Sequence, residues 1–74
     1  MQCAMERCSG YLDESQWATM RTGRDSYARA WACSTCHRLH FTNGNMCTTR
    51  GGLDVFLEDK KVVYKNETGE SVPI

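Results

Sequence analysis

Large apolar residues are scarce in this sequence. Leu, Ile, Val and Phe together make up about 15% of the 74 residues, below the roughly 20% at which a chain risks remaining disordered. A hydrophobic core this small rarely stabilises a domain of this length without an additional staple, such as a metal ion or disulfides. We therefore expect one small domain that depends on something other than apolar burial.

Long apolar runs and net charge are absent as well. No segment approaches the roughly 20 apolar residues of a transmembrane helix, and the first residues contain no apolar signal-peptide region. We therefore expect a cytoplasmic protein without a membrane partner. The formal net charge of zero provides no global indication of nucleic-acid binding.

Recognisable catalytic motifs are also missing. The sequence contains no carboxylates paired on one face, no Gly-rich phosphate loop and no Ser/His/Asp set with interpretable spacing. Gly51-Gly52 predicts a turn and not a phosphate cradle. We therefore expect a non-enzymatic protein with no small-molecule substrate.

Cysteine, in contrast, is abundant. Four of the five cysteines form two close pairs, Cys3-x4-Cys8 and Cys33-x2-Cys36. An odd count fits a disulfide framework poorly, whereas four thiolates satisfy a tetrahedral zinc ion with no open position. The spacing therefore predicts one structural Zn2+ on these four cysteines, with metal binding coupled to folding.

Other ligand sets remain open. One alternative has gaps of two, three and six residues: Cys33, Cys36, His40 and Cys47. It resembles the nucleocapsid-type zinc knuckle, although that family keeps gaps of two, four and four. Sets in which Cys47 or His37 replaces Cys3 or Cys8 are further alternatives. Without a ligand role, we expect Cys47 to be an ordinary thiol and the two histidines to face solvent.

The second cysteine pair is compatible with two other chemistries. Cys33-Ser34-Thr35-Cys36-His37 matches the attachment motif of c-type haem, and a Cys-x-x-Cys dithiol can be redox active. The strand-like flanks and the surplus cysteines argue against a haem protein, and redox dithiols usually precede a helix. Zinc therefore remains the expected cofactor.

Residues 12–21 carry the signals of a short helix. Asp13 can cap its start, Gly23 can end it, and Trp17 and Met20, spaced i and i+3, would form an apolar face. Because so short a helix is marginal, an irregular loop with one helical turn is the alternative.

The remaining segments predict strands. Residues 26–41 indicate a strand, the second cysteine pair and another strand, with alternation from Tyr27 to Trp31. Residues 53–65 predict a hairpin that turns at 58–61. We place these elements in a single domain, residues 1–66, and expect residues 67–74 to be a flexible tail.

The two cysteine pairs resemble those of the zinc ribbons, the rubredoxin-like arrangement in which two cysteine knuckles hold one zinc and a small antiparallel sheet extends from it. The matching residues are Cys3 and Cys8 in the first knuckle, Cys33 and Cys36 in the second, and the strand Tyr27–Trp31. The resemblance covers residues 3–41 and leaves the hairpin at 53–65 without a counterpart. It implies a small metal-stabilised mostly-β domain, here with one short helix. Zinc ribbons mostly bind nucleic acid, contact RNA polymerase or another nucleic-acid machine, or scaffold protein contacts.

The arginines indicate where such a contact would occur. All six lie in residues 1–50, which carry a net charge of +2, whereas residues 51–74 carry −2. Arginine pairs bidentately with phosphate and stacks on bases. The contact candidates surround the predicted ribbon: Arg21, Arg24, Arg29 and Arg38.

These features together predict a non-enzymatic zinc-binding module that contacts nucleic acid or a nucleic-acid-handling protein such as the transcription machinery. The alternative is a protein-interaction or inhibitor module, of the kind that phages and mobile elements encode, with no nucleic-acid contact. In that case the edge of the hairpin at 53–65 would add to a partner's sheet.

Overall fold

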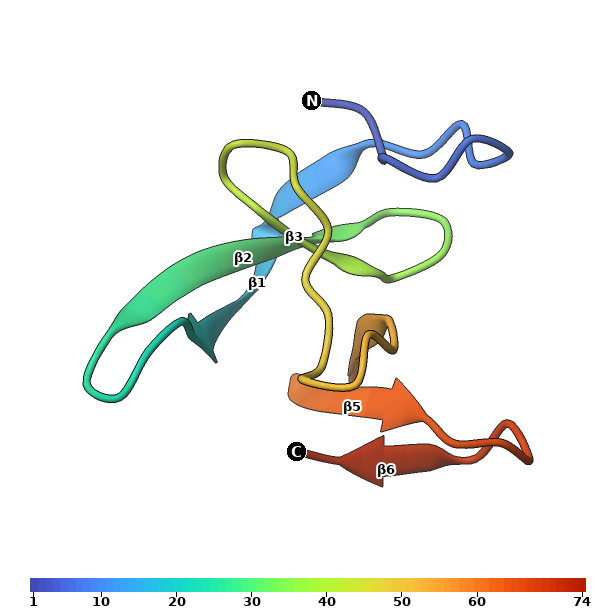
Figure 1. The fold of residues 1–74 in the computed structure, drawn as a ribbon. Helices are drawn as coiled ribbons and strands as arrows, with labels where there is room; N and C mark the ends of the chain where they lie inside the picture. The colour runs from blue at the N-terminus through green and yellow to red at the C-terminus, as the bar shows by residue number, and fades with distance from the viewer.

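The computed structural model describes residues 1–74 and contains two three-stranded antiparallel sheets and no helix (Figure 1). The first sheet has the order β1-β2-β3 and comprises β1 (Leu12–Arg21), β2 (Tyr27–Cys33) and β3 (Leu39–Phe41). The second has the order β4-β5-β6 and comprises β4 (Val55–Glu58), β5 (Lys61–Lys65) and β6 (Ser71–Pro73). Within each sheet, strands that follow one another in sequence therefore pair in space, and no helix is present that could cross a membrane.

The helix predicted at residues 12–21 is wrong, because this segment forms β1 and pairs with β2. Ala18 and Met20 pack against the core while Trp17 is 47% exposed, so the apolar period is two and not 3.6. Asp13, the expected helix cap, instead accepts hydrogen bonds from the backbone N–H and the hydroxyl of Ser15 (2.9 and 2.7 Å). These bonds lie where the register with β2 shifts, so the same signal stabilises a bulge.

The hydrophobic core lies between the two sheets. Its buried residues come from β2, β3, β4 and the segment that joins the sheets: Ala30, Ala32, Leu39, Cys47, Val55 and Leu57. Burying a Leu or Val side chain contributes about 1.5–3 kcal/mol, and two members of this cluster are alanines. The core is therefore small, as the composition indicates.

The second sheet extends beyond the hairpin expected at residues 53–65. β4 and β5 form that hairpin, and Asp59 and Lys60 at its tip have φ values of 48° and 64°, as two-residue hairpin turns require. Ser71–Pro73, in the segment expected to be a flexible tail, forms β6 and pairs with β5. A polar clamp supports this pairing, since Lys65 Nζ lies 2.6 Å from Glu58 Oε1 and Ser71 Oγ donates to Glu58 Oε2 (2.8 Å).

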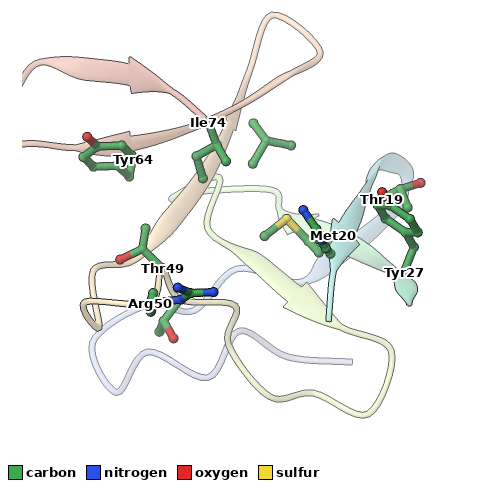
Figure 2. Close-up of a pocket in the computed structure, with 10 residues that line it drawn as sticks. Thr19, Met20, Tyr27, Thr49, Arg50, Tyr64 and Ile74 are labelled. Atoms are coloured by element: carbon green, nitrogen blue, oxygen red, sulfur yellow. The ribbon is translucent and has the colours of Figure 1, made fainter. Parts of the chain in front are cut away.

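The two sheets meet along the segment that follows β3, drawn in yellow in Figure 1. Isolated bridges pair His40 with Met46 and Arg38 with Phe56, which connects the first sheet to β4. The end of the β1–β2 hairpin and the second sheet leave a hollow between them, whose lining residues are drawn in Figure 2.

Candidate functional site

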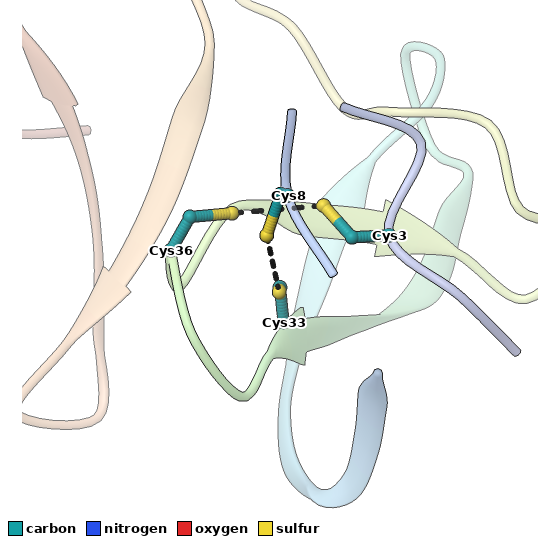
Figure 3. Close-up of side chains that lie close together, drawn as sticks. All are labelled: Cys3, Cys8, Cys33 and Cys36. Carbon is teal, nitrogen blue, oxygen red and sulfur yellow. Dashed lines mark hydrogen bonds between the residues drawn. The ribbon is translucent and has the colours of Figure 1, made fainter. Parts of the chain in front are cut away.

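Four cysteine side chains converge at the end of the first sheet (Figure 3). The Sγ atoms of Cys3, Cys8, Cys33 and Cys36 all lie within 4.8 Å of one another. The shortest separations join the two pairs, 3.6 Å between Cys3 and Cys36 and 3.5 Å between Cys8 and Cys33. A tetrahedral zinc with bonds of about 2.3 Å has sulfur–sulfur edges of about 3.8 Å. The cluster, in which all four thiols are free, therefore has dimensions that suit a metal ion.

The second cysteine pair is positioned by a tight turn between β2 and β3. Cys33 ends β2, and its sulfur accepts a hydrogen bond from the backbone N–H of Thr35 (3.4 Å). The backbone N–H of His37 donates to the Cys33 carbonyl (3.1 Å), and the N–H of Cys33 donates to Arg38 (3.0 Å). His37 has a φ of 64°, which reverses the chain at this point. The turn thus directs both sulfurs toward the same point.

The first cysteine pair lies on a hairpin-like loop that begins at Gln2 and returns at Tyr11. The N–H of Cys3 donates to Gly10 and the N–H of Cys8 donates to Met5, both at 3.0 Å. The second of these bonds closes a turn inside the four-residue gap, which explains how the wider spacing still brings the two sulfurs together.

Gly10 is the position in this loop that sequence reasoning missed. It is buried, and a Cβ atom there would lie 2.5 Å from Cys33 Sγ and 2.7 Å from Thr35 Oγ1. Real side chains do not approach so closely, so only glycine lets the two knuckles meet. A glycine two residues after Cys8 was the available signal.

Two of the thiols, Cys3 and Cys33, differ in how readily they ionise. Burial raises the pKa of Cys3 to about 12. Burial alone would also raise the pKa of Cys33, but hydrogen bonds from the backbone N–H groups of Cys36 and Thr35, together with the thiols of Cys8 and Cys36, lower it to about 7. Cys33 therefore becomes a thiolate more readily than Cys3. A bound cation would supply the positive charge that favours deprotonation of Cys3 as well.

The alternative metal ligands lie elsewhere or are already engaged. Cys47 is buried in the core between the sheets, where burial raises its pKa to about 11, and His37 is exposed. His40 is fully buried instead of facing solvent. Its Nδ1 lies 2.9 Å from the carbonyl of Arg38 and donates to it, and its Nε2 accepts the N–H of Ala4 (3.1 Å). Nε2 also lies 3.6 Å from Cys3 Sγ. Both ring nitrogens are nevertheless engaged in these hydrogen bonds, through which His40 connects the first loop to β3.

Two of the predicted contact arginines, Arg21 and Arg24, line one polar groove together with Arg50. The groove has a volume of about 540 Å³ and lies between the tip of the β1–β2 hairpin and the turn after Thr48. The lining residues are Arg21, Thr22, Gly23, Arg24, Thr48, Thr49 and Arg50. We call this feature the arginine groove; none of its lining residues is acidic or apolar.

The other two predicted arginines lie outside the arginine groove. The guanidinium of Arg29 stacks over the ring of Trp17, 4.3 Å from its centroid, on the exposed face of the first sheet. Arg38 forms an ion pair with Asp54, 2.9 Å between Nε and Oδ2, and lies over Phe56. Asp54 therefore neutralises Arg38. Sequence reasoning missed Arg50, although it belongs to the same basic half of the chain.

Comparison of the chain with protein-family models, curated proteins and solved structures found no match. The function is therefore inferred from the geometry of two features. One is a cluster of four thiols that can hold a metal ion. The other is the arginine groove, whose chemistry favours anions.

Proposed function

We propose that this chain is a non-enzymatic module, stabilised by one structural zinc ion, that contacts nucleic acid through the arginine groove. The zinc would be held by Cys3, Cys8, Cys33 and Cys36, as the resemblance to zinc ribbons implies. Four thiolates favour zinc or iron over magnesium and calcium, which require oxygen ligands. Because four protein ligands fill a tetrahedral site, the ion would organise the fold and not act on a substrate.

The observation that carries the nucleic-acid proposal is the convergence of Arg21, Arg24 and Arg50 on one groove that no acidic residue lines. Their planar guanidinium groups suit bidentate contacts with phosphate oxygens. Threonine hydroxyl groups, which line the rest of the groove, also donate to phosphates in protein–nucleic acid interfaces. The groove thus combines the two donor types that such interfaces use.

The structure separates the four candidate arginines into two that line the groove and two that do not. We assign the main contacts to Arg21 and Arg24 and add Arg50. Arg29 is exposed beside Trp17 and would contribute at the margin. Arg38 is paired with Asp54, so we assign it no contact.

The protein-interaction alternative depends on an open edge of the second sheet, and both edges are restricted. β4 is bridged to Arg38, with the N–H of Leu57 bonded to the carbonyl of His37 (3.0 Å). β6 has only three residues and includes Pro73, which cannot donate to an added strand. Strand addition is therefore the less favoured proposal.

The salt dependence of nucleic-acid binding tests the proposal. Three phosphate contacts predict that log K falls with log salt with a slope of about −2.1 for a single strand to about −2.7 for a duplex, a loss of roughly 20- to 40-fold between 50 and 200 mM. Fluorescence anisotropy with a labelled oligonucleotide measures this slope. Arg50→Gln should reduce the slope by about 1, whereas Arg7→Gln, an equal change of charge outside the groove, should not. Absence of binding, or binding that salt does not weaken, would contradict the proposal.

A further inference from the structure

The arginine groove continues into the hollow of Figure 2, which has a volume of about 560 Å³. Arg21, Thr48, Thr49 and Arg50 line both, so the two spaces adjoin. The remaining lining residues of the second space are mainly apolar or aromatic: Thr19, Met20, Tyr27, Val62, Tyr64 and Ile74. No acidic residue lines either space. A ligand that fills both must be anionic at one end and largely apolar at the other.

Two tyrosines lie on opposite walls of the second space. Figure 2 shows Tyr64 with Ile74 on the side of the second sheet, and Tyr27 with Met20 on the side of the hairpin. Tyr27 is 64% exposed, so its ring is not needed to fill the core. Exposed aromatic rings beside arginines are the surfaces on which unpaired bases stack.

The guanidinium of Arg21, at the junction of the two spaces, is held in place by hydrogen bonds before any ligand binds. Arg21 donates through Nε to Gly23 (2.9 Å) and through one terminal nitrogen to Arg24 (2.7 Å). A guanidinium has five N–H donors, so three of them remain for a ligand.

Arg50 lies in a tight turn that is closed by local hydrogen bonds. The N–H of Gly52 donates to the carbonyl of Thr49 (2.9 Å), and the N–H of Leu53 donates to the Thr49 hydroxyl (3.1 Å). Gly52 adopts a φ of 87°, which favours glycine at this position. Both arginines therefore lie on ordered backbone, which reduces the entropy lost on binding.

We infer that the groove takes single-stranded nucleic acid, with phosphates at Arg21, Arg24 and Arg50 and unpaired bases against Tyr27 and Tyr64. This inference rests on the proposed function and names its ligand. A duplex presents its phosphates but keeps its bases stacked inside, so it can fill only the arginine end. A single strand supplies both parts, and stacking on an aromatic ring tolerates any base.

The test compares three labelled ligands on the full, zinc-loaded chain: a 12-residue oligothymidine, a duplex of the same length, and an abasic sugar–phosphate strand of the same length. The oligothymidine should bind at least about 10-fold more tightly than the other two, in keeping with the usual effect of base stacking. An oligouridine strand, measured in parallel, should bind similarly.

Two tyrosine variants locate the base. Tyr27→Ala should weaken oligothymidine binding about 10-fold and leave binding of the abasic strand unchanged, whereas Tyr27→Phe should retain the affinity. Tyr11→Ala is the matched control, because Tyr11 is equally exposed at 60% but lines neither space. Circular dichroism of each variant establishes that it folds.

The outcomes separate this inference from the function on which it rests. If the duplex or the abasic strand binds as tightly as oligothymidine, or if Tyr27→Ala changes nothing, the inference is wrong while nucleic-acid binding stands. If none of the ligands binds in a salt-dependent manner, both fail. Tight binding of oligothymidine that is lost in Tyr27→Ala and unaffected in Tyr11→Ala supports the inference.

Discussion

The first and second sheets are stabilised by different means. The first ends in the cysteine cluster, where Cys3, Leu12 and Cys33 form a small buried group of their own. The second sheet contains no cysteine and depends on apolar side chains and on the clamp between Lys65 and Glu58. Val55 and Leu57 of the second sheet, however, belong to the same core cluster as residues of the first sheet. The apolar core of the second sheet therefore depends on the first sheet. Metal binding at one end should therefore stabilise the whole molecule.

Removal of a metal ligand should have the largest effect on stability. Cys33→Ala leaves three thiols, and we expect loss of the zinc together with the folding energy coupled to it, which is about 10 kcal/mol or more in small zinc domains. Both sheets should then unfold, as measured by metal content and circular dichroism. Cys47→Ala is the control, because Cys47 lies in the core and outside the cluster. A folded, zinc-loaded Cys33→Ala would contradict the role of the cluster.

Truncation of the shared core should have the next largest effect. Leu57 is buried between the sheets, and Leu57→Ala should destabilise the zinc-loaded protein by roughly 2–5 kcal/mol. One zinc per chain should nevertheless remain bound under native conditions, because none of the four cysteine ligands belongs to the core cluster that contains Leu57. Urea unfolding with a parallel metal assay measures both quantities. Loss of zinc from a folded Leu57→Ala variant would show that zinc binding depends on the shared core, which would contradict the difference between the cysteine cluster and that core.

A methyl group at Gly10 should perturb the metal end alone. Gly10→Ala places a carbon against Cys33 Sγ and Thr35 Oγ1, and overpacking of this kind destabilises by about 1–3 kcal/mol. Competition with a chelator should detect weaker zinc binding. Gly51→Ala is the control, because its new Cβ would have only one neighbour within 4 Å, Thr49 Oγ1 at 3.9 Å. Equal zinc affinity in the two variants would contradict the close approach at Gly10.

The clamp of the second sheet should produce the smallest effect, and one that depends on pH. Hydrogen bonds from Lys65 and then Ser71 lower the pKa of Glu58 below its ordinary value. A carboxyl whose pKa is lowered on folding stabilises the fold above its unfolded pKa and loses that contribution as the pH falls through the folded value. A 13C NMR titration of the Glu58 carboxyl should show the lowered pKa and its rise in Lys65→Met. An unchanged pKa in that variant would contradict the clamp.

Sequence patterns predicted the parts of the structure that depend on residues close together in the chain. Spacing alone singled out the two cysteine pairs, and alternation singled out β2 and the β4–β5 hairpin. The error at β1 arose because Asp13 can accept hydrogen bonds in a bulge as readily as at a helix cap, and only pairing with β2 decides between them.

Features that depend on distant residues could not be predicted in the same way. Gly10 is required by the sulfur of Cys33, and Arg50 joins Arg21 and Arg24 only because a turn after β3 returns to the tip of the hairpin. β6 is a three-residue strand, too short for alternation to be visible, and it forms because β5 presents an open edge. The contacts of Arg50 and β6 are set by the tertiary arrangement and leave no local pattern.

The most direct test of the central claim is a titration of the chelated chain with zinc, followed by circular dichroism. We predict that the chelated chain is unfolded and that the β-sheet signal grows until one equivalent of zinc has been added, because the core alone is too small to stabilise the two sheets. A β-sheet spectrum that is already present without zinc and does not change on its addition would contradict the claim.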